Sequence, residues 1–184
     1  MKFQKDLRWN QHVETIVNRS ASTLSFIRRT IPPQARELRA KAYKQLVRPA
    51  LEYACSVYDP LIQTLEDSLE AVQKRCARMV YNVPRISRIS TTDLLNTLDW
   101  EPLAKRRAHR RLTLFRGMHF GEVATKITDY LVPATNHHRT RRHLLCYQTP
   151  HWNSHNHKRS FFISTATLWN ALPTNSRLLC APPD

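Results

Sequence analysis

Glycine is almost missing from this chain: Gly117 and Gly121 are the only two in 184 residues. Tight hairpin turns need backbone angles that glycine adopts most easily, so a sheet with many hairpins would need more glycines. The 11 prolines fall mostly between segments with helical spacing of apolar residues. The sequence therefore predicts an all-α protein, and its length is sufficient for a domain with a hydrophobic core.

The spacing of apolar residues predicts a helical bundle of about five to seven helices. The predicted helices are residues 10–31, 34–59 in two segments that meet at Pro49, 64–80, 90–98, 102–121, 123–131 and 164–172, with caps at Asn10, Thr64, Ser90 or Thr91, and Ser164 or Thr165. Residues 133–160 show no periodicity and are rich in arginine and histidine. This composition predicts a basic, irregular arm, with a short β-hairpin as one option.

A proline interrupts the apolar segment Tyr43–Pro60, whose sequence is YKQLVRPALEYACSVYDP. Inside a helix, Pro49 would remove one hydrogen bond and clash with the preceding turn, at a cost of about 3 kcal/mol. In the first turn of a new helix the same residue costs almost nothing. We therefore expect two helical segments to meet at Arg48 and Pro49, through a kink or a break.

The net charge of +15 is unevenly distributed along the chain. Residues 61–100 contain equal numbers of acidic and basic side chains, so the positive excess lies in the two flanking parts. This pattern indicates two positive surfaces, for which RNA, an RNA–DNA hybrid or DNA is the default partner. A basic protein without a specific ligand is the alternative.

Four arginines fall on one arc of the predicted helix 102–121, and they are Arg106, Arg107, Arg110 and Arg111. An apolar arc that includes Leu112 and Phe115 lies opposite. Such a basic face is best tolerated beside a polyanion, because guanidinium groups bind phosphates through paired hydrogen bonds. A solvated outer face of a surface helix is the other interpretation.

The arm adds five cations, which are Arg139, Arg141, Arg142, Lys158 and Arg159. The aromatic residues Tyr147 and Trp152 lie between them in the sequence. Basic residues interleaved with aromatic ones suit single-stranded nucleic acid, where bases stack on rings and phosphates meet the charges. A disordered polar segment would have the same composition.

No pattern indicates a metal, a cofactor or catalysis by this chain. The six histidines of the arm lack an accepted zinc spacing, so we expect them to add positive charge as the pH falls. There is no glycine-rich phosphate loop, and no two carboxylates are marked as a magnesium-binding pair. We therefore expect no enzyme activity from this chain on its own.

The cysteines form no C-x-x-C pair, and both Cys55 and Cys76 lie within apolar helical patterns. The first residues are polar, and no apolar run approaches the ~18 residues of a membrane span. We therefore expect an intracellular protein of the nucleus or cytoplasm, with buried thiols, that is not secreted and has no membrane partner.

Five motifs occur in a characteristic order: LRWNQHV (7–13), LVRPALEYACSVYDP (46–60), LEAVQKRCARMV (69–80), LLNTLDWEPLAKRRAHRRL (94–112) and RSFFISTATLWNALP (159–173). Together they resemble the C-terminal, thumb and post-palm region of the reverse transcriptase of LINE-type, non-LTR retrotransposons of the jockey kind. The motif residues that we single out are Trp9, His12, Pro49, Glu52, Tyr53, Tyr58, Pro60, Trp100 and Trp169. Of the tryptophans, Trp9, Trp100 and Trp169 border predicted helices, which favours core anchoring over a ligand platform.

The resemblance implies a thumb that grips a template–primer duplex through its backbone, without reading the base sequence. The family is an RNA-directed DNA polymerase, but its palm with the paired aspartates, its fingers and its endonuclease have no counterpart in this sequence. We therefore expect a non-catalytic fragment of a decayed element. Its predicted parts are a thumb-like helical domain (1–132), the arm (133–160), a closing helix (161–175) and a frayed tail (176–184).

Three other hypotheses remain open. A helical interaction module would dock its apolar faces on the missing polymerase palm. An inert fragment of a transposable element would bind nothing. A nuclease with its own chemistry ranks last, because no set of carboxylates or histidines has the spacing that catalysis needs.

Overall fold

The computed structural model describes residues 9–58, 62–84, 86–134, 146–152 and 154–173, and within these ranges the protein is all-α, as predicted. The β-structure in this described part is limited to an isolated antiparallel bridge between Pro133 and Tyr147. None of its helices combines the length and the apolar character needed to cross a membrane. The chain divides into two compact units, residues 1–107 and 108–184, whereas the predicted boundary at residue 132 rests on composition alone.

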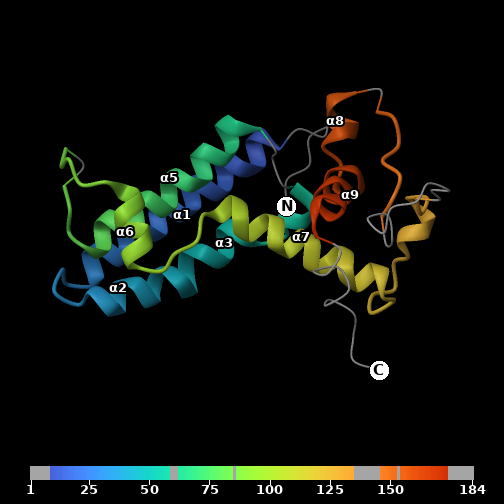
Figure 1. Ribbon diagram of the computed structural model, residues 1–184. Coiled ribbons are helices and arrows are strands. Elements are labelled where there is room, and N and C mark those ends of the chain that lie inside the picture. Colours follow the sequence, from blue (N-terminus) through green and yellow to red (C-terminus); the bar gives the residue numbers. More distant parts are fainter. Residues whose placement is uncertain (1–8, 59–61, 85, 135–145, 153, 174–184) are drawn as a thin grey trace. The chain divides into compact units, whose positions relative to one another are not determined.

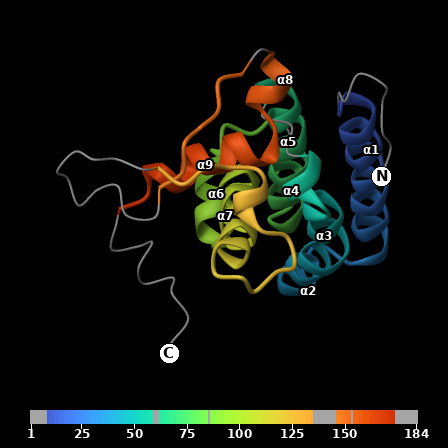
Figure 2. The same ribbon diagram turned by 90° about the vertical axis from the view of Figure 1, so that its right-hand side faces the viewer.

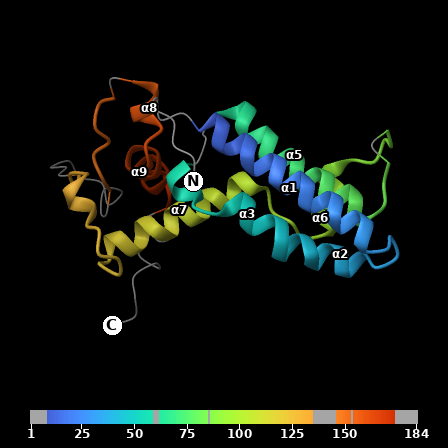
Figure 3. The same cartoon turned by 180° about the vertical axis from the view of Figure 1, so that it is seen from behind.

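Two long helices, α1 (Asn10–Thr30) and α5 (Gln63–Val80), pack side by side in unit 1 (Figures 1 and 3). Each buries one apolar stripe at helical spacing, as the sequence predicts. The predicted side-chain caps at Asn10 and Thr64 are wrong. Both residues already lie inside the first turn, where the side chain no longer stands at the capping position.

The segment around Pro49 avoids its steric conflict through a wider helical turn. Helix α2 (Arg36–Ala42) continues into a π-helical stretch, Tyr43–Val47, which leads into α3 (Arg48–Glu52) with Pro49 in its first turn. The N–H of Arg48 donates to the carbonyl of Tyr43, five residues back. This wider turn relieves the crowding between the proline ring and the preceding carbonyl groups. The predicted joint is therefore confirmed, and it is a π-helical stretch rather than a chain break.

A second interruption, after α3, is not predicted by the sequence. Ala54 has a φ of 54°, in the left-handed region that costs a non-glycine residue roughly 1 kcal/mol, and α4 (Cys55–Tyr58) starts directly after it. Cys55 and Tyr58 are buried, whereas Val57 is exposed. The prediction of one helix over residues 50–59 is wrong, because apolar spacing does not report a single reversed backbone angle.

The buried side chain of Arg39 joins the ends of two helices. Its guanidinium group donates to the carbonyl of Ile31, directly after α1, at 2.7 Å and to the carbonyl of Met79, near the end of α5, at 2.8 Å. Helices α1 and α5 therefore end on the same side of unit 1. The positive charge of Arg39, which is only 2% exposed, meets the partial negative charge of both helix C-termini.

Two further helices start in unit 1. Helix α6 (Thr91–Thr97) packs on α5, and α7 (Leu103–His119) begins in unit 1 and continues into unit 2. Beyond the end of α6, Asp99 adopts a left-handed conformation with a φ of 51°. The next residue, Trp100, is buried and stacks on Tyr43 with ring centroids 4.3 Å apart.

Unit 2 has its own small core, to which the second half of α7, a 3₁₀ turn at Ile127–Asp129 and α9 (Phe161–Ala171) contribute (Figure 2). The short helix α8 (His155–Lys158) precedes α9 and lies within the segment predicted to be irregular. Within the core, the rings of Phe115 and Trp169 lie 5.4 Å apart.

Two helix predictions in unit 2 differ from the structure. The predicted helix 123–131 is reduced to the 3₁₀ turn, although Ile127 and Leu131 are both buried, because a spacing of four residues is compatible with one turn as well as with a helix. The closing helix starts at Phe161, the first residue of the predicted part 161–175, but Ser160 rather than Ser164 or Thr165 stands at the capping position.

A histidine–tyrosine hydrogen bond lies in the core of unit 2. The Nδ1 atom of His119 is 2.5 Å from the hydroxyl oxygen of Tyr147. Burial lowers the pKa of His119 and raises the pKa of Tyr147. The phenol therefore donates the hydrogen bond, and the neutral imidazole accepts it.

Acidification is expected to destabilise unit 2 through this bond. The folded-state pKa of His119 lies below the unfolded value near 6.5, so the bond contributes fully above about pH 6.5 and is lost as the pH falls further. Thermal unfolding midpoints at about pH 7.5 and about pH 5 measure this effect. The midpoint should drop less in His119→Phe, which does not titrate, than in the native chain. Equal drops would contradict the assignment.

Candidate functional site

The four arginines of α7 do not share an exposed face, so this prediction is wrong. Arg107 is fully buried and Arg111 is 5% exposed, whereas Arg106 is partly buried and Arg110 is exposed. The buried stripe of the helix repeats every four residues and consists of Leu103, Arg107, Arg111 and Phe115. The sequence contained this signal, because both arginines stand at helical spacing from two strongly apolar residues.

Acidic and polar partners explain how three of these arginines enter the interior. The Nε atom of Arg106 lies 2.5 Å from the carboxylate of Glu52, which is 2% exposed. This hydrogen bond raises the pKa of Arg106. Arg107 pairs with Glu66 at 3.6 Å, and in unit 2 Arg111 donates to the Ser164 hydroxyl at 3.4 Å. These contacts involve the same guanidinium groups that the sequence predicts to bind phosphates.

The described part of the arm presents exposed cations. Lys158 and Arg159 are both exposed, and the Lys158 ammonium group lies 4.9 Å from the centroid of the Trp152 ring. Trp152 is itself 41% exposed. The other predicted cations of the arm lie outside the described residues, and they are Arg139, Arg141 and Arg142.

Several residues of the family motifs have structural roles. Trp9, His12 and Tyr58 form an edge-to-face cluster in which the rings of His12 and Tyr58 are 4.8 Å apart. Burial lowers the pKa of His12. Trp100 and Trp169 are buried in the cores of unit 1 and unit 2, as predicted. These motif residues therefore contribute to the packing of the protein interior, whether or not they also contribute to a binding surface.

Large apolar side chains are exposed on the segment from α2 to α4, and they are Leu38, Leu46, Tyr53 and Val57. Tyr53 is 70% exposed, and it is one of the motif residues. Pro60, the last residue of the same motif, lies outside the described residues. We call these four side chains the apolar segment surface.

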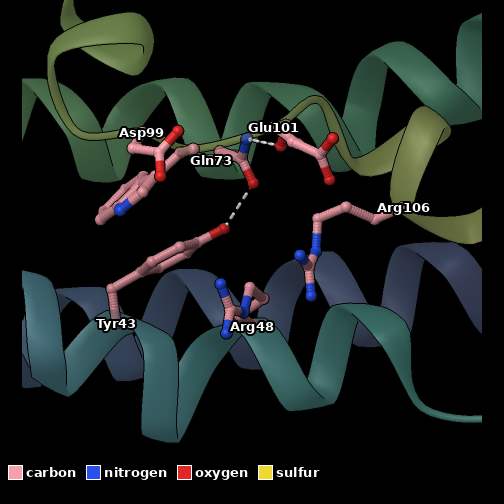
Figure 4. Close-up of a pocket in the computed structure, with 7 residues that line it drawn as sticks. Tyr43, Arg48, Gln73, Asp99, Glu101 and Arg106 are labelled. Carbon is pink, nitrogen blue, oxygen red and sulfur yellow. Dashed lines mark hydrogen bonds between the residues drawn. The ribbon is translucent and has the colours of Figure 1, made fainter.

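A polar pocket of about 340 Å³ opens in unit 1 (Figure 4). Its lining residues come from five parts of the chain and are Tyr43, Arg48, Gln73, Asp99, Trp100, Glu101 and Arg106. Gln73 connects two walls, because it accepts a hydrogen bond from the Tyr43 hydroxyl at 2.7 Å and donates to the Glu101 carbonyl at 2.9 Å. Burial raises the pKa of Tyr43, which keeps the phenol protonated. Sequence spacing misses this pocket, because its residues are distant in the chain.

The four charged side chains of the pocket differ in their pairing. Arg106 is paired with Glu52, and Glu101 is paired on the outer side with a neighbouring lysine at 2.9 Å. Arg48 and Asp99 have no ion-pair partner among the residues that the structure describes. The pocket therefore presents one positive and one negative group that are not neutralised by the described protein.

Metal binding has no candidate site in the part of the chain that the structure describes, because no three histidine, cysteine, aspartate or glutamate side chains come together there. Three of the arm's histidines, His137, His138 and His143, lie outside that part.

No protein-family model, curated protein or solved structure matches this chain. The resemblance to a retrotransposon reverse transcriptase therefore rests on the five sequence motifs. The charges, the pocket and the exposed surfaces described above are what a proposed function has to explain.

Proposed function

We propose that this chain is a non-catalytic, thumb-like segment of a LINE-type reverse transcriptase that binds the sugar–phosphate backbone of RNA, an RNA–DNA hybrid or DNA. The ordered motifs and the exposed cations support this proposal. Helix α7 contributes less than the sequence suggests, because two of its arginines are buried. Cations elsewhere on unit 1 contribute more.

The observation that carries the proposal is a group of arginines at one end of unit 1, which we call the basic end. Helices α1 and α5 end there, α2 begins there, and the loop after α5 turns there (Figures 1 and 3). Arg36 lies 5.7 Å from the ring centroid of Tyr81, which ties α2 to the end of α5. The members of the basic end are Arg28, Arg29, Arg36, Arg78 and Arg88.

Helix dipoles explain only part of this positive charge. Each helix C-terminus carries about half a negative charge, so the ends of α1 and α5 together offset about one arginine. The surrounding elements add two acidic residues, Glu37 and Asp93. With Arg39, which meets both helix ends, six arginines exceed these negative charges by about three units. Arg78 is partly buried and donates to the Pro84 carbonyl, so the excess available to phosphates lies on the exposed Arg28, Arg29, Arg36 and Arg88.

The full chain is expected to bind a fluorescently labelled RNA–DNA hybrid with micromolar or tighter affinity at low salt, because phosphate contacts release counterions. Replacing Arg28, Arg29 and Arg88 by glutamine should weaken binding about tenfold or more and reduce the salt slope by about two to three. Fluorescence anisotropy at about 50 mM and about 200 mM salt measures both quantities.

The matched control changes three exposed cations outside the basic end, Arg19, Lys44 and Lys126, to glutamine. This variant has the same net charge as the first and should retain more affinity. Equal losses in the two variants would show that only total charge matters. A native chain that does not bind at low salt would reject the proposal.

A second function, docking on a protein such as the polymerase palm, is favoured by the apolar segment surface. Four large apolar side chains stay exposed between residues 38 and 57, and where such side chains adjoin they often mark protein contacts. Sedimentation of the chain at increasing concentration distinguishes the two functions. Association that grows with concentration supports docking, whereas a monomer throughout supports nucleic-acid binding alone.

The proposal places the chain in the nucleus or the cytoplasm, where RNA and DNA partners occur. Cys55 and Cys76 are buried and form no disulfide, which suits a reducing compartment.

A further inference from the structure

Arg48 and Asp99 face the polar pocket from different sides (Figure 4). Arg48 belongs to the first turn of α3, and Asp99 belongs to the turn after α6. In this view Asp99 lies on the upper wall, Arg48 lies on the lower wall, and the Tyr43 side chain, which donates to Gln73, extends between them. Two opposite charges are therefore present in one pocket, and within the described residues they do not neutralise each other.

Asp99 occupies a backbone position that favours glycine. Its φ of 51° costs an ordinary residue roughly 1 kcal/mol relative to glycine, although aspartate and asparagine tolerate this region better than most residues. The chain places asparagine, Asn82, in the same conformation beyond the end of α5. This conformation closes the end of α6, where the N–H of Trp100 donates to the carbonyl of Leu95, and it places Asp99 at the wall of the pocket.

The two groups together define the chemistry of the ligand. A planar guanidinium group such as that of Arg48 binds a phosphate through paired hydrogen bonds. A carboxylate such as that of Asp99 accepts hydrogen bonds from sugar hydroxyls. A ribonucleotide carries both groups, whereas a deoxyribonucleotide lacks the 2′-hydroxyl. The pocket volume of about 340 Å³ is in the range of small-molecule sites.

We propose that the pocket holds one ribonucleotide unit of a bound RNA strand, with its phosphate on Arg48 and its 2′-hydroxyl on Asp99. Arg106 lines the same pocket, but its charge is paired with Glu52, so Arg48 is the cation assigned to the phosphate. The presence of a bound RNA strand depends on the proposed function, which is binding of the nucleic-acid backbone. The preference for ribose is an additional property of the pocket, because phosphate contacts at the basic end do not distinguish RNA from DNA.

Mononucleotides test the pocket independently of the strand. By NMR titration of the full chain, adenosine 5′-monophosphate should bind about tenfold more tightly than 2′-deoxyadenosine 5′-monophosphate, which is the expected value of one hydrogen bond to a charged group. Asp99→Asn should reduce this preference to less than about twofold, and asparagine also tolerates the left-handed backbone. Arg48→Gln should weaken both nucleotides about tenfold, and the control Arg19→Gln should change neither.

Each outcome decides between the alternatives. Equal binding of the two nucleotides by the native chain, no binding of either, or a ribose preference that survives in Asp99→Asn overturns the pocket assignment. Unchanged thermal midpoints show that the variants are folded. If the mononucleotides bind as expected and the labelled hybrid does not, the pocket is correct and the backbone-binding function is wrong. If the labelled hybrid binds but the mononucleotides show no ribose preference, the backbone-binding function is correct and the pocket assignment is wrong.

Discussion

Replacing Arg106 by methionine is expected to lower the free energy of unfolding by about 3 kcal/mol. The substitution keeps most of the side-chain volume but removes an ion-pair partner of Glu52, whose carboxylate is 2% exposed. A buried charge that loses its partner costs far more than the pair contributes when both members are present. Denaturant unfolding followed by circular dichroism measures the loss.

The neighbouring residue provides the control for this prediction. Lys105, on the same helix as Arg106, forms an exposed ion pair with Glu101, which precedes the helix, so Lys105→Met should cost no more than about 0.5 kcal/mol. Combining Arg106→Met with Glu52→Gln should recover part of the loss, because the uncompensated charge is then gone. If Arg106→Met were as mild as Lys105→Met, the contact with Glu52 would have no energetic importance.

Arg39→Met is expected to cause a loss of similar size, about 3 kcal/mol or more. Its guanidinium group donates to the carbonyls of Ile31 and Met79 and so satisfies acceptors that the ends of α1 and α5 leave open. Methionine has no donor, so the partly buried carbonyl of Ile31 would lose its hydrogen bonds from Arg39, whereas the carbonyl of Met79 would keep the N–H of Asn82. The loss should appear in the same denaturant experiment.

Two variants separate the role of Arg39 from general effects of charge. Arg36→Met removes an exposed arginine from the same helix, together with its contact to the ring of Tyr81, and should cost less than about 1 kcal/mol. Arg39→Lys should rescue only part of the stability, because a single ammonium group cannot span both helix ends. Full rescue by lysine would mean that charge alone matters.

The helices of unit 1 could be predicted well where one apolar stripe faces one core. The predicted segments 10–31 and 64–80 match α1 and α5 to within one residue at each end. The joint at Pro49 was predictable because proline has a known steric conflict with helices. The left-handed Ala54 was not, because no local residue preference favours that angle for alanine.

The site was predicted less well than the fold, for a physical reason. A helical projection places every arginine outward, because it ranks residues by polarity alone. The projection contains no information about Glu52, which lies 54 positions earlier in the chain and is a buried partner of Arg106. The polar pocket was missed for the same reason: it depends on contacts between distant segments, which periodicity does not report.

The π-helical stretch Tyr43–Val47 also fixes how α2 is rotated about its axis relative to α3. A wide turn accommodates one extra residue, and each residue turns an α-helix by about 100°. Deleting a single residue there would rotate α2 about its axis relative to α3. Arg39 would then turn away from the two helix ends, whereas the position of Glu52 would not change. This stretch should therefore tolerate changes of side chain far better than any change of length.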